Sequence, residues 1–459
     1  MNELIVSYSG VRGVWGESLT SEVARRYGHA FGRMVVKRHG IGGTLLIGRD
    51  TRASGPALLE AMIDGLAPHG LRFIDLGIVP TPTLQFAMKP FAAAGAVVIT
   101  ASHNPRQWNG FKFFFGPDNT VLDAAETREL METISGLDRL PDSFERPEVM
   151  DAHAEAVRLH LEKVLEQVDG ERIRDRHFRV AIDSARGAGA EPTPRLLERL
   201  GCEVVPVLSS RESEPIPENL TELRQAVRDR RCDLAFAQDL DADRLALVTE
   251  QGLAPGEELT LVLVLDHLLK RFGEGSRLVV KNAVTTRAVD ELAARFGATL
   301  VETRVGEVNL SRALLKAVRE GHTAFGGEGN GGVIFPAVGL GRDSLLGIAM
   351  VLERLSQDAR PLSAHLAELP RYAMVKEKAQ FDPTLDLEAL YRRVAEAFPG
   401  GVENRLDGIR VRFRDGTWVG VRPSNTEPIV RLIAESPSAS WAQEAVERLR
   451  SLTDSVRNR

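Results

Sequence analysis

The chain has 459 residues, of which 43% are hydrophobic and 27% are charged, and its formal net charge at pH 7 is −6. Its length exceeds what a single hydrophobic core normally serves and predicts roughly three or four domains. The negative charge argues against a nucleic-acid-binding surface, so an anionic ligand such as phosphate must be held by a local basic pocket.

Cysteine usage and hydropathy indicate the compartment. Two cysteines, Cys202 and Cys232, are too few for a disulfide framework or a cysteine-ligated zinc site. The first ten residues lack the basic start and apolar core of a signal peptide, and the strongest apolar stretch, 259–269, contains Asp266 and His267. We therefore expect a cytoplasmic protein that binds neither membrane nor nucleic acid.

One order of predicted elements recurs three times. In each cycle an apolar strand, a helix with an apolar stripe and a second strand precede a third apolar segment that ends in unusual polar residues. The first strands begin at Thr44, Phe178 and Ser276, and the closing segments begin at Gly95, Cys232 and His322. Strands that alternate with helices predict mostly parallel sheets covered on both faces, whose ligands collect beyond the carboxyl ends of the strands.

Beyond residue 368 the pattern changes. An alternating stretch at 375–381, an amphipathic helix at 387–398 and a hairpin around Asp415 and Gly416 indicate a smaller α+β unit. We therefore predict an α/β protein with three similar α/β/α sandwich domains, whose sheets are mixed but mostly parallel, and a C-terminal α+β domain. The expected domains are residues 1–150, 151–255, 256–368 and 369–459.

The stretch QDLDADR closes the second cycle. It places Asp239, Asp241 and Asp243 at alternate positions, so that an extended turn can aim three carboxylates at one point. Hard oxygen ligands of this kind suit Mg²⁺, which also accepts substrate phosphate. A solvated acidic turn is the plainer alternative. A calcium-binding EF-hand loop is rejected, because Arg244 stands where that loop needs glycine and the flanks are predicted strands.

The stretch GGEGNGG at 326–332 closes the third cycle. Its glycines let the main chain approach a ligand, while Glu328 and Asn330 supply a carboxylate and an amide for adjacent hydroxyls. A glycine-rich turn without a ligand is the alternative.

Near the C-terminus, RPSNTEPIVR collects hydrogen-bond donors within ten residues: Arg422, Ser424, Asn425, Thr426 and Arg431. Hydroxyls, an amide and guanidinium groups are the donors that a phosphate dianion needs. Ser-Asn-Thr is also common in turns, which is the alternative explanation.

Ser102 closes the first cycle in the stretch VVITASHNPRQWNG. The surrounding TASHN is not the G-x-S-x-G elbow of a serine hydrolase. A serine beside a magnesium site and a phosphate-binding segment fits phosphoryl transfer, which depends mostly on positioning and charge neutralisation. A side-chain turn before Pro105 is the alternative.

These four segments, in this order and at these spacings, resemble the loops of the α-D-phosphohexomutase family. TASHNP is similar to the phosphoserine loop, DLDADR to the magnesium loop, GEGNG to the sugar-recognition loop and RPSNTEP to the phosphate-binding loop. Further matches are SYSGVRG at 7–13, GRDTRASG at 48–55, PTPT at 80–83 and GFKFF at 110–114.

The resemblance implies a heart-shaped, four-domain enzyme that interconverts hexose 1-phosphate and hexose 6-phosphate. Its active form would carry a phosphoryl group on Ser102, with Mg²⁺ held by Asp239, Asp241, Asp243 and a phosphoserine oxygen. That group would pass to the free sugar hydroxyl and give a bound hexose 1,6-bisphosphate, which also serves as activator. The intermediate would then turn over in the site and return its other phosphate to Ser102.

By the same resemblance, Arg12, Lys112 and Arg244 should lie near the transferring group. Arg12 and Lys112 are expected to assist proton transfer or to steady the equatorial oxygens. His103 is expected to shape its loop and bind phosphate.

The sugar-recognition loop departs from much of the family, which has serine and then histidine where this chain has Asn330 and Gly332. The missing histidine shifts the expected general base to Lys112. Glu328 should still hold the ring hydroxyls at positions 3 and 4.

The Glu-x-Asn-Gly pattern resembles archaeal-type phosphoglucosamine mutases and the N-acetylglucosamine-phosphate mutase branch. Because the Asn330 amide could address an amino-sugar substituent, phosphoglucosamine mutase is the first expectation. Phosphomannomutase or phosphoglucomutase activity is the alternative, followed by a metal-dependent sugar-phosphate phosphatase. The expected partner is a small-molecule sugar phosphate, bound by a monomer or homodimer.

Overall fold

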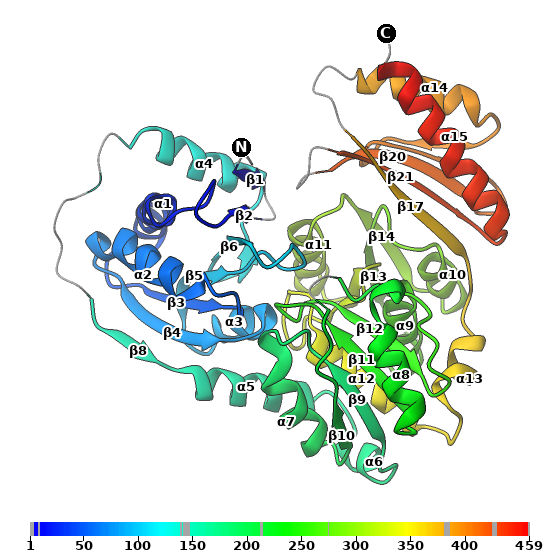
Figure 1. Cartoon of the computed structure of the whole chain (residues 1–459), viewed down its shortest axis with the longest axis horizontal. Helices are drawn as coiled ribbons and strands as arrows, with labels where there is room; N and C mark the ends of the chain where they lie inside the picture. Colours follow the sequence, from blue (N-terminus) through cyan, green and yellow to red (C-terminus); the bar gives the residue numbers. More distant parts are fainter. Residues whose placement is uncertain are drawn as a thin grey trace.

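The computed structural model describes residues 4–7, 10–137, 140, 147–211, 214–273, 275–380, 386–424 and 429–457. Their strands form four sheets that follow one another along the chain. In Figure 1 the first and fourth units form the two upper ends of an arc whose lower part is made by the second and third. No helix in the described ranges is long and apolar enough to cross a membrane.

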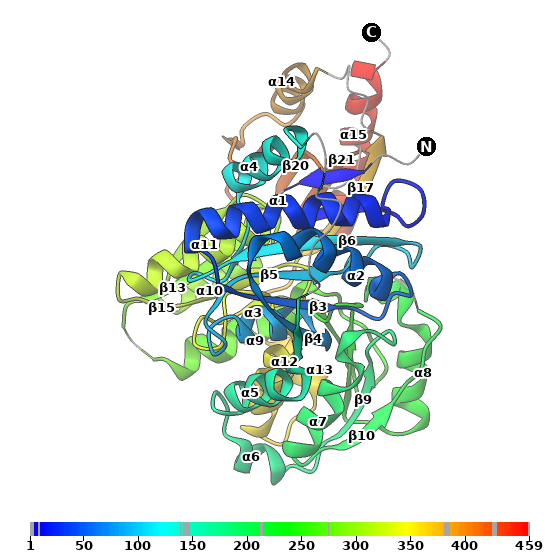
Figure 2. The ribbon, with the colours of Figure 1, turned by 90° about the vertical axis from the view of Figure 1, so that its left-hand side faces the viewer.

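The first sheet has eight strands in the order β1-β2-β6-β5-β3-β4-β8, with β7 paired to β6. They are β1 (Ile5–Ser7), β2 (Gly10–Val14), β3 (Thr44–Arg49), β4 (Arg72–Ile78), β5 (Ala93–Ile99), β6 (Trp108–Phe115), β7 (Thr120–Val121) and β8 (Val149–Asp151). The helices are α1 (Ser21–His39), α2 (Gly55–Leu66), α3 (Thr81–Ala87) and α4 (Ala124–Ser135). Figure 2 shows α1 and α2 on one face of this sheet and α3 on the other, so both faces are covered.

The second and third sheets have four strands each. The second comprises β9 (Arg179–Asp183), β10 (Glu203–Pro206), β11 (Leu234–Gln238) and β12 (Leu245–Thr249), with α5 (His153–Leu165), α6 (Gly170–Arg174), α7 (Pro192–Arg199) and α8 (Thr221–Asp229). The third comprises β13 (Arg277–Asn282), β14 (Thr299–Thr303), β15 (Thr323–Glu328) and β16 (Gly332–Ile334). Its helices are α9 (Glu258–Arg271), α10 (Ala288–Arg295), α11 (Glu307–Arg319), α12 (Ser344–Ser356) and α13 (Leu362–Ala367).

The fourth sheet is antiparallel, in the order β17-β21-β20-β19-β18. Its elements are β17 (Ala373–Gln380), β18 (Val402–Asn404), β19 (Ile409–Arg412), β20 (Trp418–Pro423), β21 (Ile429–Ser436), α14 (Leu387–Ala397) and α15 (Ala439–Arg457). The predicted fold class is confirmed: three mixed, mostly parallel α/β units precede an antiparallel α+β unit. The residue boundaries between domains stay a prediction.

The three predicted cycles share one topology. The strand orders β4-β3-β5-β6, β10-β9-β11-β12 and β14-β13-β15-β16 are equivalent. In each, the first three strands are parallel and the fourth runs antiparallel to the third. The loop between the third and fourth strands therefore leaves the carboxyl edge of every sheet, where ligands of parallel sheets collect.

A buried Asx residue ends or follows the first strand of each cycle. Asp50, Asp183 and Asn282 each accept a hydrogen bond from the backbone N–H two residues on, at 2.9, 2.8 and 3.1 Å respectively. This local turn redirects the chain out of the sheet without leaving that backbone donor unpaired. The repeat is therefore visible in side-chain chemistry as well as in strand order.

The first three units share one hydrophobic core, which contains Leu46 of β3, Phe236 of β11 and Phe325 of β15. The fourth unit has its own core, formed by residues between Ala379 and Leu449. Continuous apolar packing therefore fixes the first three loops relative to one another, whereas the fourth unit joins them through polar contacts. One of these is the ion pair between Arg410 and Glu302 at 2.6 Å.

A buried hydrogen-bond chain also joins the first three units. Thr83 Oγ1 lies 2.9 Å from His160 Nδ1, and His160 Nε2 lies 2.9 Å from Asp343 Oδ2. Because the carboxylate only accepts, Nε2 carries the proton. The other oxygen of Asp343 accepts from the backbone N–H groups of Leu345 and Leu346 at the start of α12.

Replacing Asp343 with Ala should therefore destabilise the protein by about 2–4 kcal/mol, because the helix cap and the partner of a buried histidine are lost together. Urea unfolding followed by circular dichroism measures this. Asp386→Ala is the matched control, because the Asp386 side chain caps α14. It should cost about 1 kcal/mol, and equal losses in both variants would contradict the role of the chain.

Candidate active site

Three loops at the carboxyl edges of the first three sheets converge beside one cavity. We name them the Ser102 loop (residues 100–107), the aspartate loop (239–244) and the Glu328 loop (328–331). The cavity has a volume of about 460 Å³ and is lined from all four units. Its charged and polar lining includes Arg12, His103, Lys112, Glu214, Arg244, Glu257, Asn282, Glu307, Glu328, Asn330, Arg342, Lys376, Arg422, Ser424 and Arg431.

Ser102 lies at the base of this arrangement, with only 2% of its surface exposed. Its backbone has a left-handed φ of +50°, which costs a non-glycine residue about 1 kcal/mol or more. Its N–H donates to Thr100 Oγ1 at 2.8 Å, and its Oγ donates to Asp239 Oδ2 at 3.1 Å. The strained turn therefore aims the hydroxyl at the aspartate loop.

The buried side chain of Arg52 holds the Ser102 loop in place by hydrogen bonds. Its guanidinium donates to four backbone carbonyl oxygens, three of the loop and one at the start of β6, at 2.6 to 2.8 Å, and to Asp50 Oδ2 at 3.0 Å. The carbonyls belong to Ser102, Asn104, Pro105 and Trp108. One cation thus satisfies loop carbonyls that would otherwise be buried without donors.

The carboxylates of Asp239, Asp241 and Asp243 are buried, and ligand atoms from all three lie within 4.8 Å of one another. Burial and the two neighbouring carboxylates raise the pKa of Asp239 well above its usual range. One oxygen each of Asp241 and Asp243 is buried without a hydrogen-bond partner among the described residues. A cluster of hard oxygen donors with unpartnered lone pairs fits a divalent cation such as Mg²⁺.

Lys112 compensates this negative charge. Its Nζ donates to Asp241 Oδ2 at 2.7 Å and to Asp243 Oδ2 at 3.1 Å. Burial opposes the charged amine, but the two carboxylates outweigh it and raise the pKa of Lys112. The side chain is therefore an ammonium ion here. Of the two roles expected for Lys112, this charged state favours stabilising negative charge on the phosphoryl oxygens over acting as a general base.

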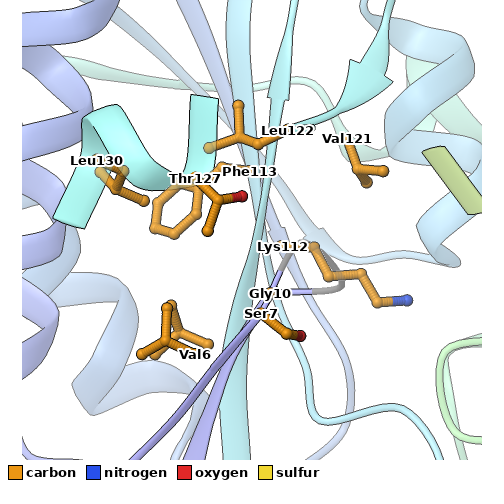
Figure 3. Close-up of a pocket in the computed structure, with 10 residues that line it drawn as sticks. Val6, Ser7, Gly10, Lys112, Phe113, Val121, Leu122, Thr127 and Leu130 are labelled. Carbon is orange, nitrogen blue, oxygen red and sulfur yellow. The ribbon is translucent and has the colours of Figure 1, made fainter. Parts of the chain in front are cut away.

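The alternation of β6 directs Lys112 to this site. In Figure 3 its side chain points away from the small apolar pocket in which Phe113, the next residue, lies near Val6 and Leu130. Successive residues of a strand face opposite sides, so Phe113 supports the core while Lys112 reaches the aspartates.

Two arginine side chains, those of Arg12 and Arg244, contact residues of the Ser102 loop. Arg12 donates to Asn104 Oδ1 at 2.9 Å, and burial lowers the pKa of Arg12 to about 10, which leaves it charged at neutral pH. Arg244 donates to His103 Nδ1 at 2.8 Å and to Glu214 Oε1 at 2.7 Å. Burial and the positive charge of Arg244 hold the pKa of His103 well below its usual range, so the imidazole is neutral.

The Glu328 carboxylate is oriented by three donors. Asn282 and Asn330 donate side-chain amide groups to it at 3.0 and 3.1 Å, and Arg342 donates at 3.0 Å. The loop also passes close to the second sheet, because a Cβ on Gly331 would lie 1.9 Å from the carbonyl oxygen of Leu245. Glycine is therefore required there both for this approach and for its φ of +79°.

The fourth sheet contributes Arg422 from β20 and Arg431 from β21, which also line the cavity, as does Ser424. The Nε of Arg422 donates to Asp407 Oδ2 at 3.0 Å, and its Nη2 is buried without a hydrogen-bond partner among the described residues. A guanidinium that lines a cavity and has a donor without such a partner fits a phosphate oxygen. Asn425 and Thr426, the remaining residues predicted for this segment, lie outside the described residues.

Family models match the chain along almost its whole length. Those for phosphoglucomutase/phosphomannomutase α/β/α domains I, II and III match residues 4–139, 158–252 and 256–372, and the C-terminal domain model matches 374–452. A probable phosphoglucosamine mutase of Methanopyrus kandleri is 38% identical over 448 residues, which cover 95% of this chain and 94% of that protein. This chain belongs to the α-D-phosphohexomutase family.

Two further similarities agree with that assignment. A phosphoglucomutase/phosphomannomutase of Thermococcus kodakarensis is 37% identical over 451 residues, covering 95% of this chain and 96% of that protein. A solved phosphoglucomutase/phosphomannomutase family protein from Burkholderia thailandensis matches with a TM-score of 0.82 and 27% identity, covering 98% and 97% of the two chains. The protein is therefore a phosphohexomutase, an isomerase of carbohydrate metabolism.

The described residues that the sequence singled out lie in the wall of this cavity or directly beside it. The residues with close contacts there that were not predicted include Arg52, Glu214, Glu307 and Arg342. Arg52 lies in the matching segment GRDTRASG, which was a usable signal. The other three stand outside any motif, and only the fold brings them to the cavity.

A pH dependence follows from Glu257 in the cavity wall. Burial raises the pKa of its carboxyl to about 7, against the opposing effect of Arg244. Its Oε1 is buried without a hydrogen-bond partner among the described residues. Because the folded state holds this proton more tightly than the unfolded chain does, stability is lost as the pH rises from the ordinary value of 4.5 through 7.

Glu257→Gln cannot ionise and should therefore raise the free energy of unfolding at pH 8 while changing it little at pH 5. Denaturant unfolding at the two pH values, with the exposed Glu320→Gln as control, measures the difference. An equal effect of Glu257→Gln at both values would contradict this assignment.

Proposed function

We propose that this phosphohexomutase interconverts glucosamine 1-phosphate and glucosamine 6-phosphate, using Ser102 as the phosphoryl carrier and a hexosamine 1,6-bisphosphate as the bound intermediate. The observation that carries the mechanism is the contact of Ser102 Oγ with Asp239, at 3.1 Å, beside a buried three-carboxylate cluster. A serine hydroxyl that is aimed at a carboxylate cluster suited to a cation matches phosphoryl transfer better than hydrolysis.

Asp239, Asp241 and Asp243 would hold Mg²⁺ together with an oxygen of phosphorylated Ser102. When bound, the ion neutralises charge on the phosphoryl oxygens. In the first transfer the bond between phosphorus and Ser102 Oγ breaks, a bond to the free sugar hydroxyl oxygen forms, and the proton of that hydroxyl is balanced by protonation of Ser102 Oγ, the state in which it donates to Asp239. In the second transfer the bond between the other phosphorus and its sugar oxygen breaks, a bond to Ser102 Oγ forms, Ser102 loses its proton and the sugar oxygen gains one.

Cationic side chains would steady the charge on the moving group. Lys112 already contacts the aspartate loop, Arg244 ends that loop with its side chain near Asp239, and Arg12 contacts the Ser102 loop. His103 is neutral and accepts a hydrogen bond from Arg244. It would shape the loop and bind phosphate rather than act as the principal general base for the sugar hydroxyl. The low exposure of Ser102 would protect the phosphoserine from water, which opposes a phosphatase.

The opposite end of the sugar phosphate would bind the fourth unit. Arg422, Ser424 and Arg431 supply donors in the same cavity. Asn425 and Thr426 remain predicted members of this phosphate-binding segment. Glu328 would accept from the ring hydroxyls at positions 3 and 4. One phosphate site and one serine can serve both ends of the sugar only if the bisphosphate turns over between the two transfers.

The choice of an amino sugar rests on Asn330 and on the similarity to the M. kandleri protein, a probable phosphoglucosamine mutase. The T. kodakarensis relative, named phosphoglucomutase/phosphomannomutase, supports glucose or mannose phosphate as the second candidate. An amide beside Glu328 provides a donor and an acceptor for a substituent at the sugar's position 2, which separates these substrates.

The carrier role predicts that Ser102→Ala lowers mutase turnover by about 10³-fold or more, because the oxygen proposed to carry the phosphoryl group is removed. A coupled assay with Mg²⁺ and a trace of glucose 1,6-bisphosphate measures this, and circular dichroism checks that the variant is folded. Turnover within a few fold of wild type would refute the role.

The substrate assignment predicts a higher kcat/KM for glucosamine 1-phosphate than for glucose, mannose or N-acetylglucosamine 1-phosphate when each is assayed separately. Asn330→Ala should reduce this preference by about tenfold, as expected for one lost hydrogen bond. Asn309→Ala is the control, because Asn309 lies on α11 and its side chain donates to nearby backbone carbonyls. A wild-type preference for glucose or mannose phosphate would overturn the assignment.

A further inference from the structure

Arg342 joins three carboxylates from three separate segments. Its Nη2 lies 2.6 Å from Asp243 Oδ2, its Nη1 lies 3.0 Å from Glu328 Oε2, and its Nε lies 2.9 Å from Glu307 Oε2. Each nitrogen of the guanidinium thus serves a different partner. The residue is 9% exposed, so these contacts are formed largely away from water.

The contacts make a continuous line of alternating charge. Lys112 touches Asp243 at 3.1 Å, Asp243 touches Arg342, and Arg342 touches Glu328. The line begins at the aspartate loop and ends at the Glu328 loop. No other side chain contacts both loops by an ion pair among the described residues.

Gly332 is what allows Arg342 to lie there. A Cβ at position 332 would stand 2.4 Å from Arg342 Cδ and 2.7 Å from its Cγ, closer than non-bonded atoms approach. Any side chain at 332 would therefore displace the stem of the arginine. The chain thus has glycine at position 332, where much of the family has histidine, and the space beside this glycine is filled by Arg342.

We propose that Arg342 is a positioning residue that couples the cation site to the sugar-binding carboxylate by fixing Asp243 and Glu328 relative to each other. The inference rests on the proposed roles of the aspartate and Glu328 loops. A planar guanidinium can hold three carboxylates in fixed directions, which the point charge of a lysine cannot do.

This role predicts opposite effects on the two ligands. Without the guanidinium, Asp243 keeps its negative charge but loses a competing cation, so a divalent ion should bind equally well or more tightly. Glu328 loses an oriented partner, so the sugar phosphate should bind more weakly. A merely structural arginine would instead weaken both ligands together.

The test is Arg342→Met, which keeps the stem and removes the charge. Calorimetric titration of the unphosphorylated protein with Mg²⁺ should give a dissociation constant equal to or below that of wild type. Titration with glucosamine 6-phosphate, and with glucose 6-phosphate in parallel, should show about 30-fold weaker binding, and KM should rise by the same factor. Arg342→Lys should recover only part of the sugar affinity.

A second substitution, Gly332→Ala, and two control substitutions keep the proposal testable even if Arg342→Met does not fold. Gly332→Ala should weaken sugar-phosphate binding in the same direction, whereas Gly339→Ala, with no atoms within 4 Å of its added Cβ, should not. Arg354→Met removes another buried arginine of the third unit, paired with Asp266 outside the cavity, and should leave both titrations unchanged.

Unchanged sugar-phosphate binding in both Arg342→Met and Gly332→Ala would overturn the proposal, as would parallel loss of Mg²⁺ and sugar affinity. If the wild-type enzyme isomerised none of the hexosamine or hexose phosphates, the proposed function would fail. The two binding titrations would still decide the role of Arg342.

Discussion

Three carboxylates buried at one point repel one another, and the site is arranged around that constraint. Asp239, Asp241 and Asp243 lie within 4.8 Å, and the surrounding residues supply opposite charge from other parts of the fold. Lys112 comes from the first sheet, Arg342 from the third unit, and Arg244 follows the aspartates directly. Because burying unpaired charge is costly, this cluster requires the first three units to be correctly docked.

The repeated topology makes that docking possible. Each of the first three sheets turns from its third to its antiparallel fourth strand at the carboxyl edge, and each turn supplies one loop of the site. A shared hydrophobic core holds these sheets together, while the fourth unit keeps a separate core. Ser102, the three aspartates and Glu328 therefore stand on units that share one core. The Arg422 segment joins these units through polar contacts such as those of Arg410 and Asp407.

Sequence periodicity was sufficient to predict the three cycles and the change near residue 368, because strand length and apolar patterning repeat. Ser102, the three aspartates and Glu328 could be predicted as site residues because each lies where a predicted apolar strand ends in polar residues. Arg342 could not be found this way. Its partners lie at positions 243, 307 and 328, and nothing local marks a buried arginine before a helix cap. The charged state of Lys112 likewise depends on carboxylates more than 120 residues away, as the separations of 129 and 131 show.

The central claim is that one serine oxygen carries the phosphoryl group between the two ends of the sugar. The most direct measurement is to label the enzyme with ³²P-glucose 1,6-bisphosphate and Mg²⁺, remove free label, map the labelled peptide, and chase with unlabelled glucosamine 1-phosphate. We predict label on Ser102 that leaves the protein within one turnover and appears in sugar bisphosphate. Normal isomerisation with no label at Ser102, or label that leaves only as inorganic phosphate, would contradict the account.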